Sequence, residues 1–371
     1  MIPYDLFYRT IDDVLLNKIG VNSYWMSSFE TLKYIHSKNF NIDRTKCIVF
    51  YDQEPIDLPS FYKFLPASPP FRKSQTRILL TSEYSNESNL LVDKFKFTAA
   101  QYFYHALLCH EWYRHHWYQN IETHTNFNKV YITYNNLILD KRLYRTNLVF
   151  SLKQRGLVEQ GLVSFSGTSE AQLEKSIATY RLLPTSHKEN IGNNLSWATG
   201  KMTIDTEDLH GSLSATVDHE TMQQAFVNLV TETIFYENKV HLTEKIFKPI
   251  VAKMPFLLLA GAGNLEYLRR YGFKTFGDFW DESYDSIIDP ATRFDAVLAI
   301  LTDLCNRPHH ELVSMKQAMT DILEYNYYHF YKTMRPIVVD ELTTGLAQAL
   351  TANEIAFDPA DLANLNRILT Y

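Results

Sequence analysis

Two short apolar runs within residues 226–276 constrain the fold of this chain more than any other feature. The first, residues 226–230, is too short for a helix and suits a parallel strand that is buried on both faces. The second, residues 256–260, ends at a glycine-rich turn, after which Asn264 can cap a helix. Strands that alternate with helices in this way are typical of a doubly wound α/β domain.

A helix-like pattern lies between these two predicted strands. Ile246, Ile250 and Met254 recur at the i, i+4, i+8 spacing that places side chains on one helix face. Thr243 precedes the pattern, and its hydroxyl group can cap the first turn. Pro249 lies too deep for the tolerated first turn, so we expect either a kink there or a later start of the helix.

Glu244 and Lys245 occupy the predicted first turn of this helix. Free backbone N–H groups and the positive end of the helix dipole lie there, where phosphate and hydroxyl groups of a ligand can be bound. Glu232 follows the first predicted strand, so its carboxylate is expected at the edge where parallel sheets bind ligands. No GxGxxG or GxxxxGK[ST] motif follows a strand, which argues against dinucleotide-binding dehydrogenases and P-loop enzymes.

One series of residues in this stretch resembles the donor-binding core of GT-B glycosyltransferases, most closely the α1,3-fucosyltransferase type. The series consists of Glu232, His241, Thr243, Glu244 and Lys245. In that family a carboxylate in an E-N-S/T turn precedes Y-x-T-E-K and a helix. The resemblance implies that Glu244 and Lys245 bind the ribose and diphosphate of a UDP- or GDP-linked sugar. Thr233 and His241 stand where the family has asparagine and tyrosine, so base and sugar stay open.

The same stretch also resembles proteins encoded by tailed phages, and this likeness runs through most of the chain. It implies a sugar acceptor in double-stranded DNA with a hydroxymethylated base. We favour this DNA acceptor. The fucosyltransferase-type series implies a glycan acceptor as the alternative, and a nucleotide-sugar-binding protein without turnover is a further one. A net charge of −6 favours the glycan. A basic cluster favours DNA, and it consists of Lys141, Arg142, Arg145, Lys153 and Arg155.

A chain of 371 residues is too long for one ordinary core, so we predict two domains. The resemblance implies a GT-B fold, in which two Rossmann-like α/β domains face each other across a cleft and a C-terminal helix crosses back. We place an acceptor-side domain at residues 1–128 and a nucleotide-sugar-binding domain at residues 129–340. A helical tail at residues 341–371 is expected to pack back on the first domain.

Carboxylates follow two predicted strands of the first domain, at residues 47–51 and 77–81. Asp52 and Glu54 follow the first strand, and Glu83 follows the second. We predict that Glu54 is the catalytic base and that Asp52 and Glu83 are its substitutes. A neighbouring like charge raises the pKa of a carboxyl group, which favours proton transfer near neutral pH. The alternative is a solvated loop that ends in a turn proline.

Two arginines lie where a helix is predicted to begin, at residues 143–152. In the resembled proteins an arginine at this place contacts the donor phosphate, and Arg142 or Arg145 matches it. The alternative is an arginine solvated on a helix face. Together with Lys245 these cations can support a leaving diphosphate, so the predicted transfer requires no metal and no cofactor besides the donor. Inversion at the sugar is implied by the resemblance alone.

Other segments yield expectations about structure and location. We predict helices at residues 31–35 and 97–117, and an irregular acceptor-side insertion or lid at residues 185–220. Acidic residues at 278–289 are interpreted as loop and capping acids rather than as a metal site. Three scattered cysteines and the absence of an apolar run of ~18 residues predict a cytoplasmic protein without disulfides or membrane contact.

Overall fold

The computed structural model describes residues 4–28, 31–34, 46–59, 61, 75–119, 121–123, 125–204 and 213–370. It divides the chain into two compact units. The first comprises Met1–Trp112 and Thr333–Tyr371, and the second comprises Tyr113–Lys332. Both units are α/β with parallel strands, as the sequence predicts. Their relation to one another is a separate question from the architecture of each.

The limits of the units differ from the predicted divisions after residues 128 and 340. The segment that begins at Tyr113 packs with the second unit, because the Tyr113 hydroxyl donates to the Ser214 carbonyl (2.6 Å) and the Tyr327 hydroxyl donates to the His116 carbonyl (2.9 Å). At the other end, helix α15 (Arg335–Ala352) runs without a break through residue 340. It therefore belongs as a whole to the first unit.

The first unit contains a five-stranded sheet in the order β2-β1-β3-β4-β6. Its strands are β1 (Asn22–Ser28), β2 (Thr31–Tyr34), β3 (Lys46–Tyr51), β4 (Thr76–Thr81) and β6 (Phe97–Gln101). Strand β2 is antiparallel to β1, and the remaining neighbours are parallel. Continuous apolar runs in β3 and β4 are buried on both faces, which is typical of central parallel strands.

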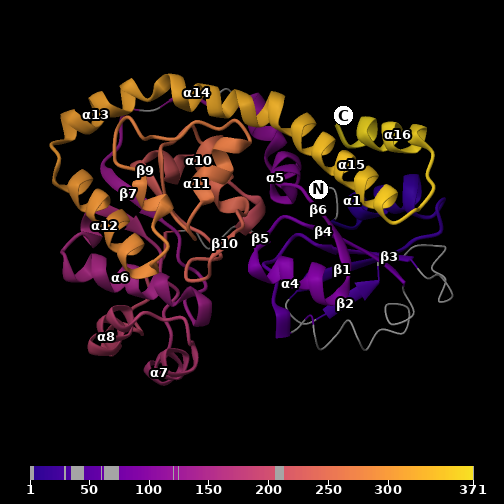
Figure 1. The fold of residues 1–371 in the computed structure, drawn as a ribbon. Helices are drawn as coiled ribbons and strands as arrows, with labels where there is room; N and C mark the ends of the chain where they lie inside the picture. Colours follow the sequence, from indigo (N-terminus) through magenta and orange to yellow (C-terminus); the bar gives the residue numbers. More distant parts are fainter. Residues whose placement is uncertain are drawn as a thin grey trace. The chain divides into compact units, whose positions relative to one another are not determined.

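Helices from both ends of the chain cover this sheet. They are α1 (Tyr4–Ile11), η1 (Asp12–Leu16), α4 (Asn86–Phe95), α5 (Tyr104–Tyr113), α15 and α16 (Pro359–Thr370), with a two-residue strand β5 (Tyr84–Ser85). Figure 1 shows α15 and α16 in yellow, and α15 packs against β6 while α16 packs against η1. The approach is close, since a Cβ added at Gly345 would lie 3.1 Å from the Ala100 Cβ.

The second unit contains a four-stranded parallel sheet in the order β11-β9-β7-β8. Its strands are β7 (Lys129–Thr133), β8 (Gly161–Val163), β9 (Ala225–Thr231) and β11 (Phe256–Leu259). All residues of β9 are buried, as expected for the predicted strand at residues 226–230. The chain leaves β7 through α6 (Leu143–Gln154) to β8, whereas β9 lies on the other side of β7. Chain connections therefore diverge between β7 and β9.

Further helices surround this sheet (Figure 1). They are η2 (Arg114–Gln119), η3 (Asp140–Arg142), η4 (Val158–Gln160), α7 (Glu170–Thr179), α8 (Thr185–Asn193), η5 (Leu195–Trp197), η6 (Leu213–Ala215), α9 (His219–Gln223), α10 (Glu244–Val251), α11 (Asn264–Arg270), η7 (Ser283–Ser286), α12 (Pro290–Asn306), α13 (His309–Ala318), α14 (Thr320–His329) and η8 (Phe330–Met334), with a short strand β10 (Lys239–Val240). Among the described residues, no helix is both long and apolar enough to cross a bilayer.

Three local predictions of secondary structure are wrong. In two of them a predicted helix is a strand, because it pairs with a neighbouring strand of the sheet. The helix predicted at residues 31–35 is strand β2, which pairs antiparallel with β1, and residue 35 lies outside the described residues. The helix predicted at residues 97–117 begins as strand β6, because Phe97–Gln101 pairs with β4. The region at 185–220, predicted to be irregular, begins with helix α8 and ends in α9, and its residues 205–212 lie outside the described chain.

Candidate functional site

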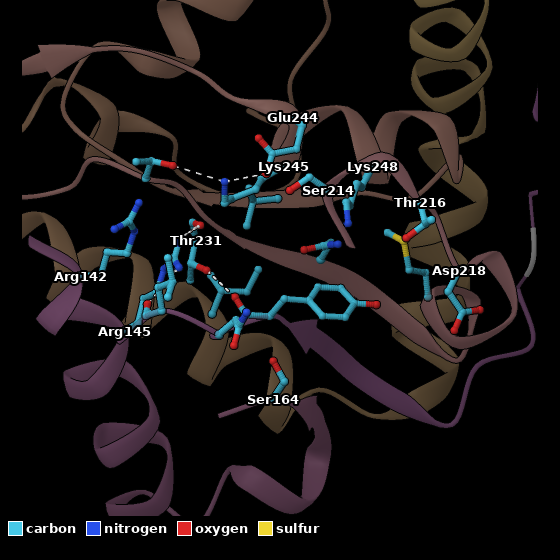
Figure 2. A pocket seen from close by; sticks show the side chains of 18 residues that line it. Arg142, Arg145, Ser164, Ser214, Thr216, Asp218, Thr231, Glu244, Lys245 and Lys248 are labelled. Carbon is cyan, nitrogen blue, oxygen red and sulfur yellow. Dashed lines mark hydrogen bonds and ion pairs between the residues drawn. The ribbon is translucent and has the colours of Figure 1, made fainter. Parts of the chain in front are cut away.

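A cavity of about 230 Å³ lies at the carboxyl edge of the second unit's sheet, where the connections of β7 and β9 diverge (Figure 2). This is the place in an open α/β sheet where ligands bind most often. The lining comes from the loop after β7, the start of α6, the segment before β9, β9 itself and the first turns of α10. These residues are Tyr134, Asn136, Leu137, Arg142, Arg145, Ser164, Ser214, Thr216, Asp218, Met222, Asn228, Leu229, Val230, Thr231, Thr233, Glu244, Lys245 and Lys248.

Lys245 is held at the start of α10 by three neighbours. Its Nζ lies 2.8 Å from the Glu244 carboxylate, 3.0 Å from the Thr243 hydroxyl and 3.3 Å from the Thr233 hydroxyl. These contacts fix the ammonium group beside the backbone N–H groups of the first helical turn. Because both side chains remain partly exposed (29% for Lys245 and 13% for Glu244), a ligand in the cavity can contact them.

Glu232 shapes the loop between β9 and α10 and is not among the residues that line the cavity. Its fully buried carboxylate accepts hydrogen bonds from the Thr243 hydroxyl (2.6 Å), the Thr243 N–H (3.2 Å) and the Thr233 N–H (3.1 Å). Burial raises the pKa of Glu232, and the charge of Lys245 opposes that rise. Thr243 occupies the N-cap position of α10, but its hydroxyl bonds to Glu232 and makes no cap, so the predicted capping bond is wrong.

His241 also lies in this loop, buried and outside the cavity lining. Its backbone N–H donates to the Asn264 side-chain oxygen (3.0 Å), and the Asn264 amide donates to the Lys239 carbonyl (3.2 Å). Asn264 therefore connects the two ends of this loop. The prediction that Asn264 caps α11 is wrong. The cap position of α11 is Gly263, at φ 81°, and the Asp285 carboxylate accepts two N–H groups of the first turn.

The two candidate arginines have different environments. Arg145 is 3% exposed and donates to the carbonyls of Thr231 (2.8 Å), Glu232 (3.0 Å) and Leu137 (3.1 Å). Its guanidinium thus joins the ends of β7 and β9 and stabilises the backbone that frames the cavity. Arg142 is more exposed, and it lies at the start of α6 with its side chain along the cavity. Arg142 is the better placed of the two to contact a ligand.

Charged groups are unevenly distributed around the cavity. Figure 2 shows Arg142 and Arg145 on one side and Thr216 and Asp218 on the opposite side. Glu244, Lys245 and Lys248 of α10 lie between them, together with Ser214. Four cations and two carboxylates line the space. A ligand with a doubly charged phosphate group and several hydroxyl groups fits this distribution.

Sequence reasoning missed several residues that the cavity brings together. Lys248 follows Lys245 by three positions, a spacing that places both on one helix face and that was visible in the sequence. Asn228 is a polar residue inside an apolar run, which was a second visible signal. No comparable pattern marks Ser214, Thr216 or Asp218, because only the fold brings this segment to the sheet.

The first unit carries the predicted catalytic carboxylates. Asp52 is fully buried and accepts hydrogen bonds from the Tyr8 hydroxyl (2.7 Å) and from the Tyr102 hydroxyl. Burial raises the pKa of Asp52 from 3.8 to about 7, and these two hydrogen bonds oppose part of that rise. The sequence prediction attributed such a shift to repulsion between Asp52 and Glu54, so its direction agrees with the structure but its cause was wrong.

Glu83 connects two loops of the first unit. Its carboxylate is fully buried and accepts hydrogen bonds from the Ile56 N–H (2.7 Å) and from the Ser85 hydroxyl. It therefore stabilises the segments that follow β3 and β4. Glu54 is partly exposed, and among the three predicted carboxylates it is the one that solvent reaches.

Within the part of the chain that the structure describes, no group of three or more His, Cys, Asp or Glu side chains is arranged to hold a metal ion. Most acids at residues 278–289 have local roles instead. Asp289 caps α12 through the Thr292 N–H (2.8 Å), and Glu282 pairs with Arg269 (2.8 Å).

Comparison with known proteins adds no assignment to these observations. Neither the protein-family models nor the curated protein sequences that were searched match this chain.

Proposed function

We propose that the chain is a glycosyltransferase of the GT-B type whose second unit binds a nucleotide-sugar donor. The observation that carries this proposal is the cavity between the ends of β7 and β9, in which Arg142, Lys245 and Lys248 surround one space with Glu244. A diphosphate needs several fixed cations, and ribose hydroxyl groups need an acceptor beside them. The two parallel α/β sheets are compatible with the GT-B architecture.

In this proposal the cations act on the leaving group. Negative charge develops on the diphosphate as its bond to the sugar breaks, and fixed positive groups stabilise that charge. Lys245 is already held by Glu244, Thr243 and Thr233, so its position requires little reorganisation when the donor binds. Arg142 and Lys248 add charge from two further positions.

Transfer also requires a base that takes the proton of the acceptor hydroxyl. We assign this role to Glu54, because Asp52 and Glu83 are fully buried and bonded within the first unit. A buried carboxylate that already accepts hydrogen bonds from its own fold cannot reach an acceptor. Glu54 is partly exposed and follows a central strand of the sheet.

The acceptor is a hydroxyl group of a glycan or of a hydroxymethylated base in DNA. The basic cluster that favoured DNA does not form one free surface: Arg145 is buried, Arg142 lines the cavity, and the Lys153 ammonium lies over the Trp197 ring at 4.4 Å. The resemblance to phage proteins therefore still favours DNA as the acceptor, but the basic cluster no longer does. The acidic net charge favours a glycan.

A screen of UDP- and GDP-linked sugars for thermal stabilisation tests the proposal. A donor present at 100 times its Kd should stabilise the protein by about 2.7 kcal/mol. Donors that stabilise are then incubated with hydroxymethylated DNA, unmodified DNA and glycans, and the release of nucleoside diphosphate is measured. Absence of stabilisation by every nucleotide sugar would overturn the proposal. Stabilisation without turnover on any acceptor would identify a binding protein instead.

A further inference from the structure

Asn228 is placed unusually for an asparagine. It lies in the middle of β9, a strand that is buried along its whole length, and is itself 3% exposed. Its side-chain amide makes no hydrogen bond with any residue that the structure describes, although it lines the cavity. The amide atoms are accessible from the cavity and are not enclosed in the core. An amide that has no protein partner and faces a cavity points to a ligand with matching hydrogen-bonding groups.

The neighbours of Asn228 suit a flat, mostly apolar group. Met222, Leu229 and Val230 also line the cavity, and Tyr134 adds an aromatic ring. The Asp218 carboxylate, which lines the same space, already accepts hydrogen bonds from the Thr221 N–H (3.1 Å) and hydroxyl (2.6 Å). Apolar side chains together with an aromatic ring and an amide are surroundings that suit a nucleobase.

We infer that the cavity binds a pyrimidine base whose edge bonds to the Asn228 amide, so that the donor is uridine-linked rather than guanosine-linked. The inference rests on the proposed nucleotide-sugar site, in which Arg142, Lys245 and Lys248 hold the diphosphate and the Asn228 amide is left for the base. An amide offers one donor and one acceptor next to each other. Uracil offers the complementary pair, an N–H beside a carbonyl oxygen.

Size, and not the hydrogen-bonding edge, separates guanine from uracil, because guanine also presents an N–H beside a carbonyl oxygen and an amide can pair with either base. Guanine has two fused rings, and the cavity of about 230 Å³ is smaller than the ~300–1,000 Å³ of most ligand pockets. The same argument applies to adenine, whose edge an amide can also match.

Calorimetry on the full chain with UDP, CDP, GDP, ADP and inorganic pyrophosphate tests the inference. We expect a pyrimidine nucleotide to bind at least about tenfold more tightly than either purine nucleotide, because two fused rings exceed the space that suits a single ring. Asn228→Leu keeps the size of the side chain and suits a buried strand. It should weaken UDP binding about tenfold, because the base loses its hydrogen-bond partner, and leave pyrophosphate binding unchanged.

The outcomes separate this inference from the proposed function. Equal affinity for UDP and GDP in the unaltered protein, or unchanged UDP affinity in Asn228→Leu, would overturn base reading and leave the donor site standing. Absence of binding by every nucleotide and by pyrophosphate would overturn both. Thermal unfolding shows whether Asn228→Leu is folded, and if it is not, the base preference of the unaltered protein decides alone.

Discussion

Both units place polar residues just after the carboxyl ends of parallel strands, but these residues have different roles in the two units. In the first unit, Asp52 and Glu83 follow central parallel strands, but both carboxylates are buried and hydrogen-bonded to their own unit. In the second unit, the carboxyl ends of β7 and β9 frame a cavity lined by Lys245 and Glu244. A position just after a parallel strand is therefore not enough to make a ligand site.

Chain topology accounts for the difference. In the first unit, β3, β4 and β6 follow one another across the sheet in a single direction. In the second unit, the chain runs from β7 to β8 on one side and from β9 to β11 on the other, and the cavity lies where the segments after β7 and β9 diverge. Divergence of this kind is the general origin of ligand crevices in open α/β sheets.

The largest expected effect would show that the first unit also takes part in chemistry. We predict that Glu54→Gln lowers turnover about 10²- to 10⁴-fold, the usual contribution of a general base, while donor affinity stays unchanged. Steady-state kinetics and calorimetry measure the two quantities. Turnover equal to that of the unaltered protein would show that Glu54 is a turn residue. None of the three predicted carboxylates of the first unit would then act in catalysis.

The next prediction concerns the frame of the cavity in the second unit. Arg145→Leu removes the donor of two buried carbonyl groups and of one part-buried carbonyl group, so it should lower the free energy of unfolding by about 3 kcal/mol. Arg142→Leu is the matched control and should change stability by less than about 0.5 kcal/mol while weakening donor binding. Denaturant unfolding separates the two. A stable Arg145→Leu protein that no longer binds donor would reverse their roles.

Lys245→Ala tests the cationic side of the cavity directly. Loss of hydrogen bonds from a charged group to the diphosphate should weaken donor binding about 10- to 100-fold, corresponding to roughly 1.5–3 kcal/mol. Lys153→Ala is the control, because Lys153 lies over Trp197 and outside the cavity lining. Calorimetry with the donor from the thermal screen measures both. Equal affinities in the two variants would exclude Lys245 from the site.

The last prediction is a pH dependence in the first unit. Burial places the pKa of Asp52 at about 7 in the folded protein, above its ordinary value of 3.8, so the folded state binds more protons between these values. Stability contributed by the protonated group is thus complete at low pH and decreases as pH rises through this window, by about 1 kcal/mol per pH unit. Asp52→Asn should remove this slope in urea unfolding at several pH values. An unchanged slope would assign it to another group.

Local patterns predicted the parts of the fold that depend on neighbours in the sequence. Continuous apolar runs identified β3, β4, β9 and β11, because a strand buried on both faces needs no partner-specific signal. The helix predicted over β6 shows the limit, since an aromatic-rich run is compatible with a helix until its pairing with β4 is known. Competition of this kind between local and tertiary preference is not visible in a single sequence.

The candidate site was predictable to a similar extent. Glu244 and Lys245 lie at the cavity because a helix that follows a buried strand begins at the edge of the sheet. Thr243 and Asn264 were assigned as caps from their residue types, but Glu232 and the Lys239 carbonyl compete for their side chains. Arg145 was expected at a ligand, and buried carbonyls 86 and 87 positions away bind it instead. Such partners become known only from the fold.

Discontinuity of the first unit has a consequence for synthesis on the ribosome. The second unit, Tyr113–Lys332, is one uninterrupted segment, so it can complete its core as soon as that segment has emerged. Sheet β2-β1-β3-β4-β6 is translated earlier, yet α15, which covers β6, belongs to Thr333–Tyr371. The first unit therefore cannot complete its packing until α15 has been synthesised. Until then the face of β6 that α15 covers stays accessible to chaperones, while the second unit is being made.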